Sequence, residues 1–269
     1  MTSLARLCLE RTVVEWKTFF RNWQAAFFTF LLPILIMVVF GSMFHERLLG
    51  PPGSAQIGYP QLMLAGMIGA TVFSTAFSGI AIGVAIEQHE GLLKRLAATP
   101  LPRAAYFVGK IVTMLAVSLL SVAIMTAIGV AVFDITLPAG PARWATFVAV
   151  YIEGYVACAA LGLAYTRIIP NASAAPAIVQ PLFLALFFIS GTFTLFSQMP
   201  GWMQQTAALF PLKWMAQGMR YVFLPDWFGA SEPAGGPELG RVHLILLAWI
   251  VAGLAACLLF FRWHRRDDR

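Results

Sequence analysis

Long apolar stretches separated by short polar connections run through the chain. A helix needs about 20 mainly apolar residues to cross a bilayer, and lipid offers its backbone no hydrogen bonds outside the helix. The stretches that meet this length are residues 25–44, 62–86, 111–133, 144–165, 174–195 and 242–261. We therefore expect an all-α integral membrane protein with six transmembrane helices, forming one transmembrane domain over residues 1–269.

The composition supports a membrane protein. Hydrophobic residues make up 59% of the chain and charged residues 11%, whereas soluble domains carry about 25% charged residues. The net charge of +6 does not indicate a nucleic-acid partner, because no stretch outside the predicted spans is long enough to fold into a basic face. The three cysteines form no CxxC pair and the four histidines are scattered, so we expect neither a disulfide nor a metal site.

The positions of Lys and Arg predict the orientation. Thirteen of the 18 lie in the N-terminal segment, the second and fourth connections and the C-terminal tail. Cytoplasmic segments carry such an excess, so we expect a multi-pass protein of the cell membrane with both termini in the cytoplasm. A long charged segment precedes the first apolar stretch, so we do not expect a cleavable signal peptide.

Residues 1–24 have the pattern of an amphipathic helix. Large apolar side chains recur at helical spacing, at Leu9, Val13, Trp16, Phe20 and Trp23. Charged side chains lie beside them, at Arg6, Glu10, Lys17 and Arg21. Either an ordinary linker or a helix lying in the membrane interface would fit, and the tryptophans favour the interfacial helix.

The connection between the fifth and sixth spans divides into two parts. Residues 196–224 are too apolar for an ordinary loop and too short to cross, and Pro200 and Pro211 interrupt them. We expect two short re-entrant helices that enter the outer leaflet and return. Residues 225–240 are acidic and rich in Gly and Pro, and we expect an exposed loop.

Two features within the spans are candidates for packing or for a pathway. The second span carries small residues four positions apart, at Gly66, Ala70, Ser74 and Ser78. Such spacing lets helices approach closely, within one subunit or between two. Glu153 is the clear acid within a span, and it either contacts substrate or forms a structural hydrogen bond.

The connection between the second and third spans, residues 87–100, carries the strongest functional pattern. On a helix, one face bears Leu92, Leu93, Leu96 and Ala97, and the other bears Glu87, Glu90, Lys94 and Arg95. Pro100 ends the helix. A solvated loop needs no row of leucines, so the pattern favours a short helix that docks in a groove of a soluble partner.

This connection resembles the signature segment of ABC type-2 exporter permeases, the superfamily of daunorubicin-resistance, nodulation and O-antigen export subunits. The matching residues are Glu87, Glu90-Gly91, Leu92-Leu93, Arg95-Leu96, Thr99-Pro100 and Gly109-Lys110. A second similarity, to the fifth span and outer hairpin of that family, lies in residues 190–193, 199–202 and 210–212.

The resemblance implies an ATP-driven exporter of a hydrophobic drug, a lipid or a lipid-linked molecule. Two permeases, identical or sister chains, would form the pathway in the lipid, and two separate ATP-binding subunits would dock on residues 87–100 as the coupling helix. The chain lacks the Gly-x-x-x-x-Gly-Lys-Ser/Thr phosphate loop, so we expect it to be no enzyme and to bind no cofactor, with ATP and Mg held by the partner.

Two other functions are weaker readings of the same sequence. A secondary transporter or channel would usually place several ionisable or Gly/Pro-broken elements at mid-membrane, often in repeats. A membrane-embedded enzyme would need clustered His, Asp or Glu. One acid within a span, without a clear repeat or cluster, favours the permease.

Overall fold

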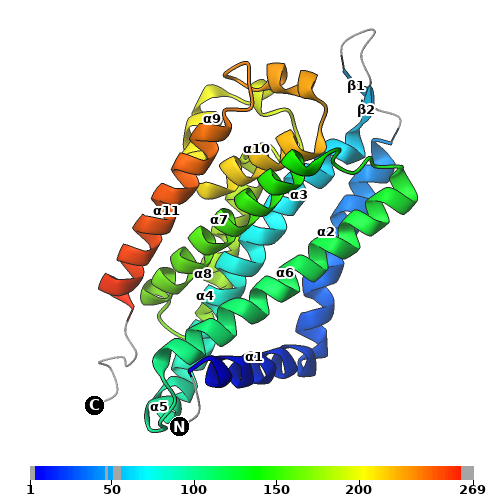
Figure 1. Cartoon of the computed structure of the whole chain (residues 1–269). Helices are drawn as coiled ribbons and strands as arrows, with labels where there is room; N and C mark the ends of the chain where they lie inside the picture. Colours follow the sequence, from blue (N-terminus) through cyan, green and yellow to red (C-terminus); the bar gives the residue numbers. More distant parts are fainter. Residues whose placement is uncertain (1–3, 46–47, 51–55, 262–269) are drawn as a thin grey trace.

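The computed structural model describes residues 4–45, 48–50 and 56–261. It is a helical bundle with a helix lying across one end and a cap of short elements at the other (Figure 1). Among the cations that predicted the orientation, Arg47 and the tail residues Arg262, Arg265, Arg266 and Arg269 lie outside the described residues, as do residues 1–3 of the predicted interfacial helix.

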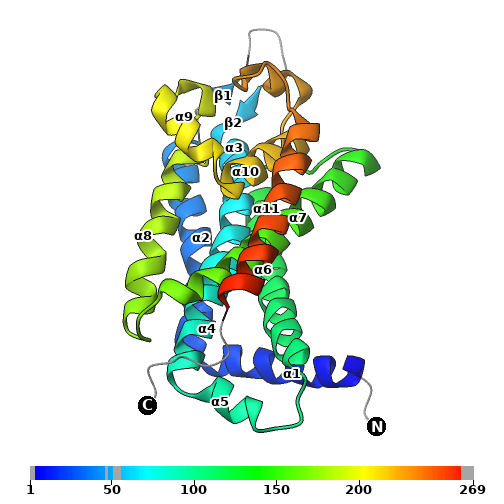
Figure 2. The same ribbon diagram turned by 90° about the vertical axis from the view of Figure 1, so that its left-hand side faces the viewer.

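The N-terminal helix α1 (Leu4–Arg21) lies across the end of the bundle, transverse to the spanning helices (Figure 2). Its large apolar side chains stay on the surface, with Leu9, Val13 and Phe20 all exposed. The Asn22 side chain accepts a hydrogen bond from the Ala25 amide at 3.4 Å and begins α2, which runs Trp23–Met43.

The second span is the centre of the bundle. It is one continuous helix formed by α3 (Tyr59–Phe73), a π-helical turn η1 (Ser74–Gly79) and α4 (Ile80–His89). In its most apolar stretch 78% of the residues are buried inside the chain, against 17% for α2. The span contacts α2, α6 (Arg103–Phe133), α7 (Pro141–Tyr165), α8 (Ala174–Ile189) and α10 (Pro211–Phe223).

The small residues of the second span pack within the chain. Ala70 and Ser78 are buried, and Ser74 is half-buried. A Cβ atom at Gly66 would lie 2.7 Å from the Cα of Thr192, so only a glycine fits beside that backbone. Of the two arrangements that the sequence left open, the structure shows close packing inside one subunit for Gly66.

Three further long helices complete the bundle: α6 (Arg103–Phe133), α7 (Pro141–Tyr165) and α11 (Leu239–Phe260). A short turn, η2 (Thr166–Ile168), extends α7. α6 begins before residue 111, and the charges of Arg103 and Lys110 in its first turns are the reason that the predicted span began only at 111. α11 packs along α7, where a Cβ at Gly253 would lie 2.9 Å from Cβ of Ala160.

The fifth predicted span, 174–195, is shorter than expected. Helix α8 covers Ala174–Ile189, and the chain then turns through Gly191, whose φ of +78° favours glycine. The Ser190 hydroxyl lies 2.9 Å from that of Thr192 within this turn. Among the described residues, five helices are long and apolar enough to cross a membrane, and α8 is a shorter apolar helix.

Short elements form the cap. They are β1 (Leu48–Leu49), β2 (Ile57–Gly58), η3 (Phe196–Gln198), α9 (Gly201–Ala208), the last turns of α10 (Pro211–Phe223) and η4 (Asp226–Ser231). The strands pair antiparallel, and the sequence pattern did not predict them. The two short helices expected within 196–224 are present as α9 and α10.

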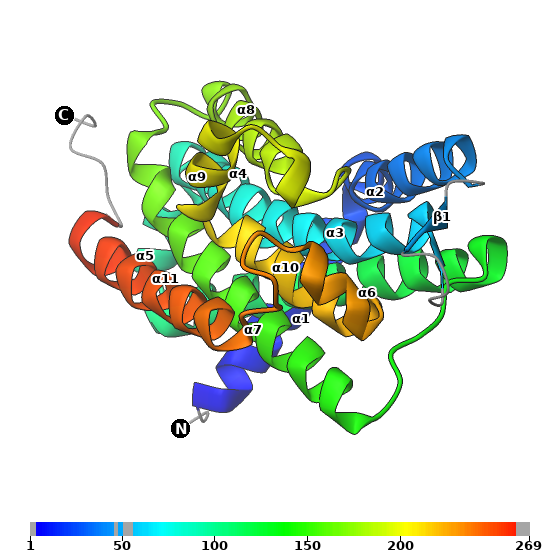
Figure 3. The same cartoon turned by 90° about the horizontal axis from the view of Figure 1, so that it is seen from above.

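Helix α10 is buried in the middle of the bundle, between α3 and α7 (Figure 3). Glycines on both neighbours and on α10 itself allow the close approach. A Cβ at Gly69 would lie 3.1 Å from the Ala216 amide, and one at Gly218 would lie 2.8 Å from Val150. The last turns of α10 therefore face the cap while its body fills the space between spanning helices.

Candidate functional site

The connector, residues 87–100, is two helices rather than one. α4 ends at His89, and α5 covers Leu92–Ala97. Gly91 between them has φ +74°, a left-handed conformation that residues with a Cβ rarely adopt. The break turns α5 away from the axis of the second span, so the predicted single helix is bent at Glu90 and Gly91.

The leucines of the connector face the chain itself. Leu93 is 1% exposed and belongs to the main hydrophobic core, and Leu96 packs partly against that core. Leu92 is half-buried. The sequence pattern predicted that these side chains contact a partner. Leu93 instead packs α5 against the bundle, so its side chain is not available to a partner in this structure.

The exposed side of the connector is polar. Its exposed residues are Glu90, Lys94, Arg95, Ala97, Ala98, Thr99 and Pro100. The Thr99 hydroxyl donates to the Leu96 carbonyl at 2.7 Å and accepts from the Leu101 amide at 3.4 Å. These two bonds close the turn after α5 and hold the exposed segment in a fixed shape.

Glu87 is part of a cluster of four charges that joins three helices. Its carboxylate accepts a hydrogen bond from the Tyr106 hydroxyl at 2.5 Å and pairs with Lys110 on α6. Lys110 also pairs with Glu15 on α1, and Glu15 pairs with Arg11. We call Arg11, Glu15, Glu87 and Lys110 the four-charge cluster.

The side chains of the four-charge cluster are largely buried in the chain. Glu15 is the one residue of α1 that is buried, among those that the structure describes. The two acidic and two basic side chains of the four-charge cluster balance in charge, so no buried charge is left uncompensated. A Cβ at Gly109 would lie 2.7 Å from Cγ of Arg11, so Gly109 is the position at which α1 crosses α6.

A neighbouring hydrogen bond reinforces the crossing. The Thr113 hydroxyl on α6 donates to the Thr12 carbonyl of α1 at 3.2 Å. The sequence indicated Glu87 and Gly109-Lys110 but missed Arg11, Glu15 and Tyr106. The signal for the first two was the i, i+4 spacing of opposite charges on α1, which is too common to select them.

A second polar group lies in the cap, on one face of α10. Arg220 donates from Nε to Oε1 of Glu232 at 2.6 Å and from Nη1 to the Gly191 carbonyl at 3.2 Å. Lys213, two turns earlier, pairs with Gln217, and its Nζ lies 3.5 Å from the centre of the Trp214 indole.

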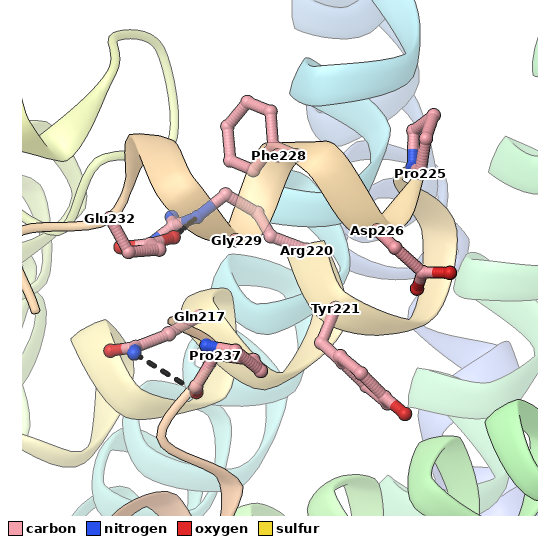
Figure 4. Close-up of a pocket in the computed structure, with 9 residues that line it drawn as sticks. All are labelled: Gln217, Arg220, Tyr221, Pro225, Asp226, Phe228, Gly229, Glu232 and Pro237. Atoms are coloured by element: carbon pink, nitrogen blue, oxygen red, sulfur yellow. Dashed lines mark hydrogen bonds and ion pairs between the residues drawn. The ribbon is translucent and has the colours of Figure 1, made fainter. Parts of the chain in front are cut away.

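A cavity of about 180 Å³ lies between α10 and the segment that follows it (Figure 4). Its walls are Gln217, Arg220, Tyr221, Pro225, Asp226, Phe228, Gly229, Glu232 and Pro237. Beside it, Arg143 donates to the Leu224 carbonyl at 2.5 Å and to the Asp226 carboxylate at 2.6 Å. Arg143 thereby fastens the end of α10 to the start of α7.

Glu153 has a partner on a neighbouring helix. Its Oε2 lies 2.7 Å from Nδ1 of His243, which joins α7 to α11. Both side chains are partly exposed on the chain. The hydrogen bond supports structural packing, one of the two roles that the sequence left open for Glu153.

A family model described as ABC-2 type transporter matches residues 6–224, which is more than half of the chain. The match begins in α1, includes the connector and the four-charge cluster, and ends just after α10. No curated protein matches the chain.

Proposed function

The chain belongs to the ABC-2 type transporter family, and on that premise we propose that it is the permease subunit of an ATP-driven exporter. Membership makes it a multi-pass membrane permease that pairs with an ABC ATP-binding subunit in general. We further propose that two permeases and two ATP-binding subunits assemble in the cell membrane, and that the cargo is a hydrophobic drug, a lipid or a lipid-linked molecule.

The observation that carries the proposal is the double attachment of the connector. Its exposed side is polar and held in shape by Thr99, which suits contact with a soluble subunit. Its other side is fixed to the bundle by Leu93, and Glu87 at its start is fixed to α6 and α1. A displacement of α5 by a partner is therefore passed directly to α4, α6 and α1.

The nucleotide cycle would act through this attachment. A ligand shifts a conformational equilibrium only through its different affinity for the two states. ATP held by the partner would favour a closed pair of ATP-binding subunits, and their closure would move the two connectors. The π-helical turn η1, on the same continuous helix as α4, is a position where a spanning helix can bend.

The proposed orientation places α1 and α5 in the cytoplasm and the cap outside. The excess of Lys and Arg in the N-terminal segment, the second and fourth connections and the C-terminal tail supports it. α1 would then lie in the cytoplasmic headgroup region with its exposed apolar side chains in the lipid. In the same orientation, α9 and α10 would be the re-entrant pair in the outer leaflet.

The test is reconstitution with the partner. The permease is co-expressed with a candidate ATP-binding subunit, copurified, and assayed in liposomes for cargo-stimulated ATP hydrolysis. Arg95→Glu, on the exposed side of α5, should abolish copurification, while Arg21→Glu, an exposed cation of α1, should leave it intact. ATP hydrolysis by the permease alone, or transport without an ATP-binding subunit, would refute the proposal.

A further inference from the structure

Helix α1 carries a basic face at the end that leads into α2. Its residues, Lys17 and Arg21, lie one helical turn apart and are both exposed. Among the residues that the structure describes, neither side chain has an ion-pair partner. Figure 2 shows α1 extending across the end of the bundle, so the basic face is open to whatever surrounds the bundle there.

The other charges of α1 are neutralised within the chain. Arg6 pairs with Glu10 at 2.8 Å. Glu15 pairs with Arg11, and also with Lys110 at 2.8 Å. Both acids of α1 therefore have cations of their own, and the two positive charges of the basic face receive no anion from this helix.

Aromatic side chains flank the basic face. Phe20 and Trp23 are 38% and 65% exposed. The Phe20 ring is held by Trp16, at 4.8 Å between centroids, and by stacking on Phe30 of α2 at 6.3 Å. Exposed aromatic rings beside Lys and Arg are typical of protein surfaces at the depth of lipid headgroups.

The spacing of the two cations suits one phosphate group. Side chains four residues apart on a helix have Cβ atoms about 5–6 Å apart. Arg donates two parallel hydrogen bonds to phosphate oxygens, and Lys adds a point charge. The helix dipole favours a cation in the last turn, which accounts for Arg21, whereas Lys17 lies one turn earlier.

We propose that the basic face binds the headgroup of an anionic phospholipid. A zwitterionic headgroup would bring a further cation beside Lys17 and Arg21, so a net negative charge is preferred. The exposed rings of Phe20 and Trp23 would contact the glycerol and upper acyl region of the same lipid. Because the basic face lies outside the bundle, this lipid is a neighbour in the bilayer and not a cargo between the spans.

The test needs no ATP-binding subunit, so its outcome does not depend on the exporter assignment. The full-length chain is delipidated in a neutral detergent and titrated with phosphatidylglycerol or phosphatidylcholine of the same acyl chains. Native mass spectrometry gives the apparent Kd of the first bound lipid. We expect phosphatidylglycerol to bind at least tenfold more tightly, because each Lys or Arg near an anionic membrane surface contributes about fivefold. Equal Kd values for the two lipids overturn the proposal.

A double variant places the binding on the basic face. Lys17→Gln with Arg21→Gln should reduce the preference for phosphatidylglycerol to less than threefold. The matched control, Lys94→Gln with Arg95→Gln, removes the same charge from the exposed side of α5 and should keep the preference. A preference that persists in the first variant overturns the proposal. An equal loss in both variants does so too, because the lipid would then respond to net charge alone.

Folding of each variant is checked by its elution volume and its melting temperature. If the double variant does not fold, Lys17→Gln decides alone, and a wild-type preference in Lys17→Gln overturns the proposal. Glycerol phosphate carries the anionic group without acyl chains, so it distinguishes a lipid from a soluble phosphate. At equal concentration it should not displace phosphatidylglycerol, and displacement would assign the basic face to a soluble phosphate and overturn the proposal.

Discussion

The Lys110 ammonium on α6 lies 2.8 Å from the Glu15 carboxylate on α1, and the two side chains are only 8% and 5% exposed. This contact joins the helix that lies across the end of the bundle to a spanning helix. The same ammonium pairs with Glu87 at the start of the connector. One buried cation therefore couples the position of the connector to that of α1.

Replacing this cation tests the coupling. Lys110→Met keeps the length of the side chain but leaves Glu15 and Glu87 with less positive charge than they need. Breaking a buried ion pair by removing one partner typically costs about 3–5 kcal/mol. We expect a loss of that order in the free energy of unfolding, measured by SDS titration in mixed micelles.

The matched control is Lys17→Met, which removes an exposed cation from α1. Such surface changes usually stay within about 0.5 kcal/mol. If the two variants are equally stable, the four-charge cluster does not hold α1 against α6.

The crossing of α1 and α6 is tested without changing any charge. In Gly109→Ala the new methyl group would lie 2.7 Å from Cγ of Arg11, so α1 must move outward. Overpacking of this kind costs about 1–3 kcal/mol. Gly83→Ala is the control, because a Cβ at Gly83 would meet nothing within 4 Å, and alanine favours a helix by up to about 1 kcal/mol over glycine.

We expect Gly109→Ala to unfold at lower SDS fraction than the wild type and Gly83→Ala at equal or higher fraction. Cysteine crosslinking between α1 and α6 gives a second readout, which should weaken only in Gly109→Ala. If Gly109→Ala and Gly83→Ala unfold at the same SDS fraction, α1 does not pack on α6 as the structure shows.

Much of this fold follows from the sequence, because the membrane imposes simple requirements on helix length and polarity. The first span was predicted to within a few residues. The end of α8 was not, because residues 190–195 are mostly apolar and only the left-handed conformation of Gly191 marks the turn. Apolar character alone does not distinguish a span that continues from a chain that folds back.

The four-charge cluster shows where prediction from sequence stops. The row of large apolar residues predicted a lipid-facing side of α1, and Leu9, Val13 and Phe20 are exposed on the chain. The rotation that brings Glu15 to Lys110 depends on where α1 crosses α6, and hence on Gly109. This rotation depends on tertiary packing, and so does the burial of Leu93 in the core. Residue types predicted a short helix within residues 87–100, which α5 confirms, while packing decided which of its faces meets the bundle.

The last prediction separates the two sides of the connector. Leu93 is buried in the core of its own chain, and Arg95 is exposed. Leu93→Ala should loosen α5 from the bundle, at about 2–5 kcal/mol for a buried leucine, and leave the polar side available to the partner.

We therefore expect Leu93→Ala to copurify with the ATP-binding subunit and hydrolyse ATP, but to lose cargo transport, because the partner would move α5 without moving the spans. Leu209→Ala, at an exposed leucine of the cap, controls for the change in side chain. If instead Leu93→Ala fails to copurify, Leu93 contacts the partner directly, as the sequence pattern first indicated, and α5 must rotate when the complex forms.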